Sequence, residues 1–186
     1  MKRIPKLAIV GRPNVGKSAL FNCICKRRIA IVDEAEGITR DRLYAETDLF
    51  GLKFEIIDTG GINPRSSALF NDAIKRQAEI AIEEADTIVM VVDSHVGITD
   101  LDIEVARILL KTNKPLCLAV NKVDNTNEEH MIFEFDSLGI SKKVAVSASH
   151  NWHIAELLET AMEGFVNDEV EYEEPKGIKV AIIGRP

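Results

Sequence analysis

The sequence predicts a three-layer α/β domain with a mostly parallel sheet. Several unbroken apolar runs have the composition of strands that are covered by helices on both faces. Segments with helical spacing of apolar residues separate these runs, and such alternation is typical of a parallel sheet between two helical layers. The apolar runs are Leu7 to Val10, Ile88 to Val92, Leu116 to Val120 and Val144 to Val146.

A hairpin is predicted between the first two apolar runs. Tyr44 to Phe50 mixes polar and apolar residues, and Gly51 then turns the chain into Phe54 to Ile57. This pattern around a glycine turn predicts an antiparallel strand at a sheet edge. With the four apolar runs, the hairpin gives a six-stranded sheet with one antiparallel edge strand.

Two later segments have helical patterns. Leu101, Val105 and Leu109 follow helical spacing. Thr99 stands three residues before Asp102, which predicts a capping box at the start of that helix. A second apolar stripe runs from Ile154 to Phe165. We assign this stripe to the core and give it no functional role.

Composition indicates a globular domain outside the membrane. The chain has 186 residues, of which 46% are hydrophobic and 28% charged, and this is enough for one core. No apolar stretch approaches the ~20 residues of a membrane span, and the basic start lacks the apolar core of a signal peptide. We interpret the three cysteines as reduced thiols and expect a cytoplasmic protein. The net charge of −7 argues against a direct nucleic-acid patch here.

A repeat indicates how the chain is divided. Residues 179–186 match residues 6–13 at six of eight positions. We therefore expect a first domain at 1–166 and the truncated first strand and loop of a second domain at 178–186. The acidic segment 167–177 is interpreted as a solvated linker, with an acidic recognition tail as the alternative.

The residues after the first apolar run fit the phosphate-binding pattern G-x-x-x-x-G-K-[ST]. Glycines let backbone N–H groups turn inward around phosphate oxygens, and the positive end of the following helix faces the same anion. Lys17 would reach the β- and γ-phosphates, and Ser18 would offer its hydroxyl to Mg²⁺. An ordinary glycine-rich turn is the alternative. The expected binding residues are Gly11, Arg12, Pro13, Asn14, Val15, Gly16, Lys17, Ser18 and Ala19.

A second cluster follows the hairpin. Asp58 ends a predicted strand, and Thr59, Gly60 and Gly61 come next. A carboxylate at this place can hold Mg²⁺ through water, and a glycine N–H can meet the terminal phosphate. The pattern D-x-x-G is weak alone, but here it ends a strand 41 residues after Lys17.

A third cluster predicts the base. Asp124 can accept hydrogen bonds from both N1–H and the exocyclic amine of guanine, whereas adenine would leave the carboxylate unsatisfied. Asn121 can tie loops together, and the stem of Lys122 can lie against the ring. A polar turn that starts a helix is the alternative. The residues are Asn121, Lys122, Val123 and Asp124.

A fourth cluster, Ser147, Ala148 and Ser149, follows the last apolar run. A backbone N–H there would donate to guanine O6. Each cluster falls where a strand ends, and ligands of open α/β sheets bind outside the carboxyl ends of the strands. We therefore expect the four clusters to form one site.

In this order the clusters, together with Thr39, resemble those of the Ras-like GTPases over residues 6 to about 165. The segments Gly11–Ser18, Gly37–Arg42 and Asp58–Ile62 look like the bacterial Era/TrmE group, and the repeat at 179 is similar to the EngA (Der) family of tandem GTPases. The resemblance implies a Ras-like P-loop G domain that binds GTP and GDP with Mg²⁺ and hydrolyses GTP. It also implies a factor that matures the large ribosomal subunit.

The resemblance further implies roles for single residues. Thr39 would join Mg²⁺ in the GTP state only, and segments 28–41 and 60–67 would be the switches. Ile62 stands where many Ras-like proteins have a glutamine that orients water. Asn14 would instead hold a K⁺ ion that stabilises the transition state, with Arg40 as a weaker candidate. The expected metal ligands are Ser18, Thr39, Asp58 and Asn14, and the expected catalytic residues are Asn14, Lys17, Thr39 and Gly61.

Two other functions fit the same residues. The domain would serve chiefly as a nucleotide-gated docking module, with turnover incidental, or it would be a TrmE-like GTPase of tRNA modification. The repeat at 179–186 argues against the tRNA enzyme, because tandem domains belong to the EngA pattern.

Overall fold

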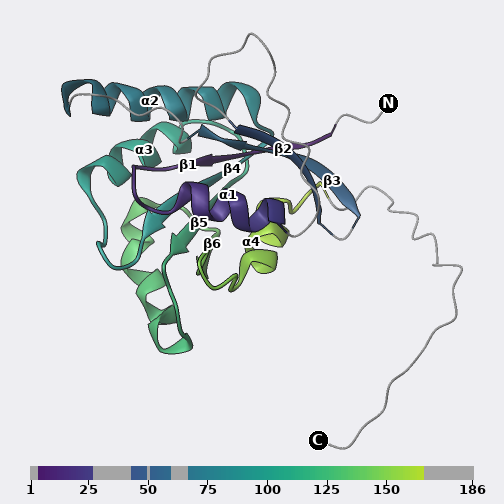
Figure 1. Ribbon diagram of the computed structural model, residues 1–186. Coiled ribbons are helices and arrows are strands. Elements are labelled where there is room, and N and C mark those ends of the chain that lie inside the picture. Colours follow the sequence, from purple (N-terminus) through teal and green to yellow (C-terminus); the bar gives the residue numbers. More distant parts are fainter. Residues whose placement is uncertain (1–3, 27–42, 50, 60–66, 166–186) are drawn as a thin grey trace, which may run out of the picture.

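The computed structural model describes residues 4–26, 43–49, 51–59 and 67–165. Within them lies a six-stranded sheet in the order β2-β3-β1-β4-β5-β6 (Figure 1). Neighbouring strands are parallel except β2 and β3, which form the predicted hairpin at one edge. The strands are β1 Lys6–Val10, β2 Leu43–Leu49, β3 Leu52–Asp58, β4 Thr87–Asp93, β5 Leu116–Asn121 and β6 Lys143–Val146. The predicted sheet is confirmed.

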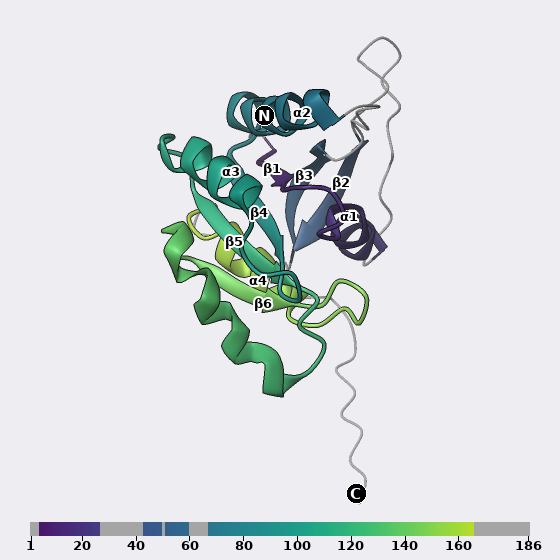
Figure 2. The ribbon, with the colours of Figure 1, turned by 90° about the vertical axis from the view of Figure 1, so that its left-hand side faces the viewer.

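Helices cover both faces of the sheet (Figure 2). Side chains of α1 and α4 share one buried cluster with the sheet, and side chains of α2, α3 and the 3₁₀ segment η2 share the other. The bounds are α1 Lys17–Lys26, α2 Ser67–Glu84, α3 Asp100–Leu110, η2 Thr126–Leu138 and α4 Ile154–Ala161. The three-layer arrangement is therefore as predicted.

Period-2 alternation explains how one strand serves two cores. In β1, Leu7 and Ile9 belong to the cluster with α1 and α4, whereas Ala8 and Val10 belong to the cluster with α2 and α3. All four are fully buried. Because successive side chains point to opposite faces, an unbroken apolar run is what a doubly covered strand requires.

The start of α3 and the apolar stripe of α4 agree with the sequence pattern. The Thr99 hydroxyl accepts from Asp102 N–H, and the Asp102 carboxylate accepts from Thr99 N–H, so the predicted capping box is present. The helix α4 ends at Ala161, earlier than its apolar stripe, but Met162 is still buried and Phe165 packs against the same core. The stripe is a core stripe, as expected.

No helix among the described residues combines the length and apolar character needed to cross a membrane. The expected linker at 167–177 and the second-domain start at 178–186 lie outside the described residues.

The buried aromatic ring of Phe54 on β3 gives a test of the core. Phe54 is fully buried, whereas Phe133 on η2 is 66% exposed. We expect Phe54→Ala to lower the free energy of unfolding by about 3–5 kcal/mol, because it leaves a cavity. The matched change Phe133→Ala should stay within about 0.5 kcal/mol. Urea denaturation measures both, and equal losses would contradict this packing.

Candidate functional site

The phosphate-loop residues lie between β1 and α1 in a loop that is held close to its neighbours. A Cβ built on Gly11 would lie 2.4 Å from the carbonyl oxygen of Val91, and one on Gly16 would lie 2.2 Å from Nδ2 of Asn121. A side chain at Gly11 would therefore clash with the backbone of β4, and one at Gly16 would clash with the Asn121 amide. Asn14 is exposed with a φ of 65°, a left-handed conformation that asparagine tolerates.

Lys17 lies inside this loop. Its Nζ donates to the carbonyl oxygens of Gly11 at 2.7 Å and Arg12 at 2.9 Å, and the residue is 6% exposed. Burial lowers the pKa of Lys17 to about 8, with Arg12 adding to the effect and Asp58 opposing it. An anion at the loop would favour the charged ammonium group, because an opposite charge raises the pKa of a lysine.

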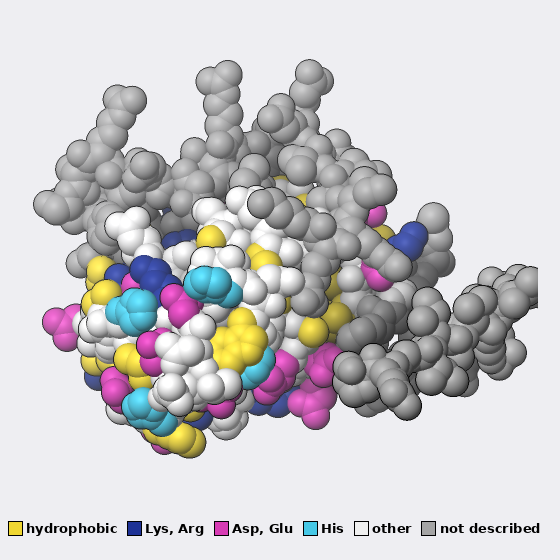
Figure 3. Space-filling view, turned by 60° about the horizontal axis from the view of Figure 1, so that its bottom comes forward, with side chains coloured by type: hydrophobic (Ala, Val, Ile, Leu, Met, Phe, Trp, Pro, Cys, Tyr) yellow, Lys and Arg dark blue, Asp and Glu magenta, His cyan; other side chains and the backbone are white. Residues whose placement is uncertain are grey.

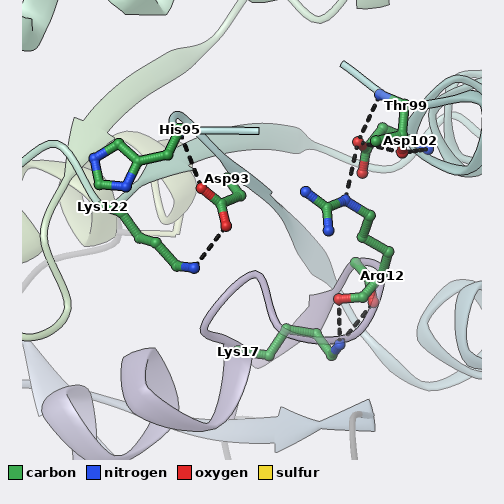
Figure 4. A network of polar contacts seen from close by, with 8 residues as sticks. Arg12, Lys17, Asp93, His95, Thr99, Asp102 and Lys122 are labelled. Atoms are coloured by element: carbon green, nitrogen blue, oxygen red, sulfur yellow. Dashed lines mark hydrogen bonds and ion pairs between the residues drawn. The ribbon is translucent and has the colours of Figure 1, made fainter. Parts of the chain in front are cut away.

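The Arg12 side chain points away from Lys17 (Figure 4). Its Nε donates to Oδ2 of Asp102 at 3.3 Å, and that buried oxygen also accepts from the N–H and hydroxyl of Thr99. The guanidinium group thus anchors the loop to the start of α3. The Arg12 carbonyl oxygen therefore binds Lys17, whereas the Arg12 side chain forms this anchor.

Two oxygen-bearing side chains, Ser18 and Asp58, are in contact beside the loop. The Ser18 hydroxyl donates to Oδ2 of Asp58 at 3.1 Å, and Asp58 is 2% exposed at the end of β3. Next to it, the Thr59 hydroxyl donates to the Ile9 carbonyl at 2.7 Å and joins β3 to β1. Hydroxyl and carboxylate oxygens suit Mg²⁺, which keeps several waters and takes few protein ligands. No group of three or more His, Cys, Asp or Glu that could hold a metal ion occurs among the described residues.

Asn121 connects three loops. Its Nδ2 donates to the carbonyl oxygen of Val15 at 2.8 Å, and its Oδ1 accepts from Ala148 N–H at 3.0 Å. The residue is 3% exposed at the end of β5. The phosphate loop, the loop after β5 and the loop after β6 are therefore adjacent, as the strand ends predicted. Of the backbone N–H groups at 147–149, one of which is expected to donate to guanine O6, that of Ala148 is used by Asn121 in this structure.

Lys122 is fixed by a residue that the sequence reasoning missed. Its Nζ donates to Oδ2 of Asp93 at 2.6 Å, and its backbone φ is 71°. Burial acts to raise the pKa of Asp93, but hydrogen bonds from Lys122 and from the backbone N–H of His95 hold it below the usual value. Asp93 ends β4 opposite Asn121 on β5, so the same strand-end pattern points to it.

Asp124 lies at the far end of this group. Its Oδ1 accepts from the Ser147 hydroxyl at 2.6 Å and lies 3.1 Å from Nδ1 of His150. The bond from Ser147, with a smaller contribution from His150, holds the pKa of Asp124 below its usual value. Ser149 lies 3.0 Å from Ser147, hydroxyl to hydroxyl, and the buried Val123 keeps its backbone paired with β6. His150 was not predicted.

Several expected residues cannot be placed. Thr39, Gly60, Gly61 and Ile62 lie outside the described residues, as do 28–41 and most of 60–67. The described residues of the expected site follow the carboxyl ends of β1, β3, β5 and β6, which lie on one rim of the sheet.

A family model and curated relatives match this chain in sequence. A family model described as "50S ribosome-binding GTPase" matches residues 6–122. A protein named GTPase Der from Protochlamydia amoebophila (strain UWE25) is 68% identical over 186 residues, which is 100% of this chain and 38% of that protein. GTPase Der from Streptococcus gordonii is 52% identical over 98% of this chain and 42% of its own length. The chain spans about two fifths of the length of these relatives. Their similarity confirms the resemblance to the EngA (Der) family.

Solved structures confirm the Ras-like fold. Era in complex with MgGDPNP and nucleotides 1506–1542 of 16S ribosomal RNA matches with a TM-score of 0.66 and 26% identity, over 88% of this chain and 57% of that chain. The G domain of the T. maritima FeoB iron transporter matches with a TM-score of 0.64 and 23% identity, over 87% and 98%. The second likeness shows the fold alone.

The contribution of the Asn121 hydrogen bonds to the stability of the fold can be measured. Asn121→Asp keeps an acceptor for Ala148 N–H but loses the donor to Val15, and it sets two oxygens against each other. We expect the free energy of unfolding to fall by about 2–3 kcal/mol. Asn125→Asp is the matched control, because Asn125 caps η2 as an acceptor and should change stability by less than about 0.5 kcal/mol. Equal effects in urea denaturation would contradict the linking role.

Proposed function

Because this chain belongs to the family of 50S ribosome-binding GTPases, we propose that it binds guanine nucleotides at this rim and hydrolyses GTP to GDP and phosphate. The observation that carries the proposal is the pair of hydrogen bonds made by Asn121 to Val15 and Ala148. They hold the loop of Lys17 and the loop of Asp124 side by side, so that a single nucleotide can bridge them.

At the phosphate end, Lys17 and the loop backbone would bind the β- and γ-phosphates. Phosphate oxygens can replace the carbonyl oxygens of Gly11 and Arg12 as acceptors for the ammonium group of Lys17. The N-terminus of α1 points its positive end at the same place. The charge of Arg12 is already neutralised by Asp102, so we assign phosphate binding to Lys17 and the backbone.

Ser18 and Asp58 would hold Mg²⁺, which neutralises charge on the β- and γ-phosphates when bound. The contact between their oxygens supports this assignment. Thr39 remains our proposal for a third ligand in the GTP state. For K⁺, we propose Asn14, which is exposed at the tip of the phosphate loop and carries an amide oxygen.

At the base end, Asp124 would accept from N1–H and the exocyclic amine of guanine. Adenine lacks both donors at these positions, so its binding would leave a carboxylate unsatisfied. The ion pair with Asp93 holds the Lys122 side chain, and its stem would lie against the base. The exposed fraction of the Asp124 side chain, 39%, leaves the carboxylate accessible to a ligand.

For the whole protein, we propose a ribosome-assembly factor of the cytoplasm that acts on the large subunit or its precursor. The description of the family supports the ribosomal role. The relatives' greater length is consistent with a second G domain that begins at 178, after a linker at 167–177. The nucleotide state would then order the segments 28–41 and 60–67, and so act as a switch.

The choice of base can be tested with Asp124→Asn. Its amide offers a donor where xanthine has the C2 carbonyl, so affinity for GDP should fall about 100-fold while affinity for XDP rises. Fluorescence titration with labelled GDP and XDP measures both. Asp100→Asn, an exposed change at the start of α3, should leave both affinities unchanged. Retention of guanine preference by Asp124→Asn would overturn the assignment.

The role of Asn14 can be tested by single-turnover hydrolysis in KCl and in NaCl. We expect hydrolysis at least about tenfold faster in KCl, because positive charge at the transition state is commonly worth this much or more. Asn14→Ala should remove the difference, whereas Asn127→Ala, an exposed change on η2, should keep it. Equal rates of the parent chain in both salts would remove the K⁺ hypothesis.

A further inference from the structure

His150 contacts the Asp124 carboxylate, the group that is proposed to accept hydrogen bonds from the base. Its Nδ1 lies 3.1 Å from Oδ1 of Asp124, 3.0 Å from the Ser147 hydroxyl and 3.2 Å from the Ser149 hydroxyl. The imidazole is therefore within hydrogen-bonding distance of the carboxylate to which the proposed function gives base selection.

The acceptor capacity of Asp124 limits what can bind there. Each carboxylate oxygen offers about two lone-pair sites. On Oδ1, one site is taken by the Ser147 hydroxyl at 2.6 Å, and His150 lies where a donor would take the other. A guanine that pairs with both carboxylate oxygens needs that second site, so the imidazole and the base exclude each other.

We propose that His150 is an affinity-determining residue of the base site that takes the place of the guanine N–H on Asp124 and must withdraw before the base binds. Since a charged donor binds a carboxylate more strongly than a neutral one, protonation of His150 would make the withdrawal harder. This inference rests on the proposed function, because it requires that Asp124 reads the base.

The loop is built so that only the side chain has to move. Ser147 and Trp152 exchange backbone hydrogen bonds of 3.2 and 3.0 Å, and the His150 N–H donates to the Ser147 hydroxyl at 3.2 Å. This short loop holds the backbone of His150 at both sides. The imidazole itself is 62% exposed, so its rotation into solvent displaces no core residue.

The charges around this contact allow the pH dependence to be assigned. Besides Asp124, they are the Lys122–Asp93 ion pair, Glu128, which accepts from Asp124 N–H, and His95, whose charge acts on Asp124. In model peptides, a histidine side chain titrates between about pH 6 and pH 8, whereas Asp and Glu side chains stay charged. Histidines gather with acidic and basic side chains on one face of the molecule (Figure 3), so histidine controls are needed.

The test compares GDP affinity at about pH 8 and pH 6, an interval that spans the titration of an ordinary histidine. The chain is compared with His150→Ala, which has no donor, and His150→Gln, which has a donor that does not titrate. Controls are His130→Gln and His95→Gln, which remove other imidazoles. Taking the ratio of variant to parent affinity at each pH cancels titration of the phosphates and of Lys17.

We expect His150→Ala to bind GDP about two- to fivefold more tightly than the parent chain at about pH 6, a gain consistent with an exposed ion pair. The gain should shrink toward about pH 8, where histidine is neutral. His150→Gln should lack this pH dependence, and His130→Gln and His95→Gln should follow the parent chain. If the ratio of the GDP affinity of His150→Ala to that of the parent chain is the same at both pH values, the inference is overturned.

The two failures can be told apart. If the parent chain binds no GDP at about pH 8, where an ordinary histidine is neutral, the proposed function fails and this inference fails with it. If it binds GDP normally but His150→Ala follows its pH profile, only the role of His150 is wrong. If His95→Gln abolishes the pH dependence while His150→Ala does not, the titrating group is His95, which also overturns the inference.

Discussion

The site depends on one buried amide, the side chain of Asn121. Its donor binds the phosphate loop and its acceptor binds the loop after β6, so it holds these two loops beside the end of β5. Gly16 permits this, because a Cβ there would lie 2.2 Å from the amide nitrogen. A buried polar group is costly unless it is paired, and here both halves of the amide are paired with backbone groups of different loops. The stability of the fold and the geometry of the site thus share the same two hydrogen bonds.

Two of the basic side chains of this rim form ion pairs with buried carboxylates. Arg12 and Asp102 neutralise each other at the start of α3, and Lys122 and Asp93 do so where β4 and β5 end. Lys17 is held instead by backbone carbonyls, and its lowered pKa of about 8 reflects burial that an incoming anion would offset. Arg12 and Lys122 thus act as anchors through carboxylates, whereas Lys17 keeps the role in phosphate binding that we propose.

The strands could be predicted because their signals are local. Unbroken apolar runs defined the parallel strands, and the glycine turn at Gly51 defined the antiparallel hairpin. The sequence reasoning missed Asp93, although it ends β4 as Asn121 ends β5. It also missed His150 and the use of the Arg12 side chain by Asp102, since no spacing rule relates positions that meet only through folding.

By itself, the sequence determined the order of the strands along the chain and the polar loops that follow them, from which we propose a ligand. These follow from residue type and short-range spacing, which the backbone periods of 2 and 3.6 residues translate into faces. Tertiary structure alone decided which groups pair. Asn121 meets Val15 across 106 positions and Arg12 meets Asp102 across 90, because parallel strands that are distant in sequence end at a common rim.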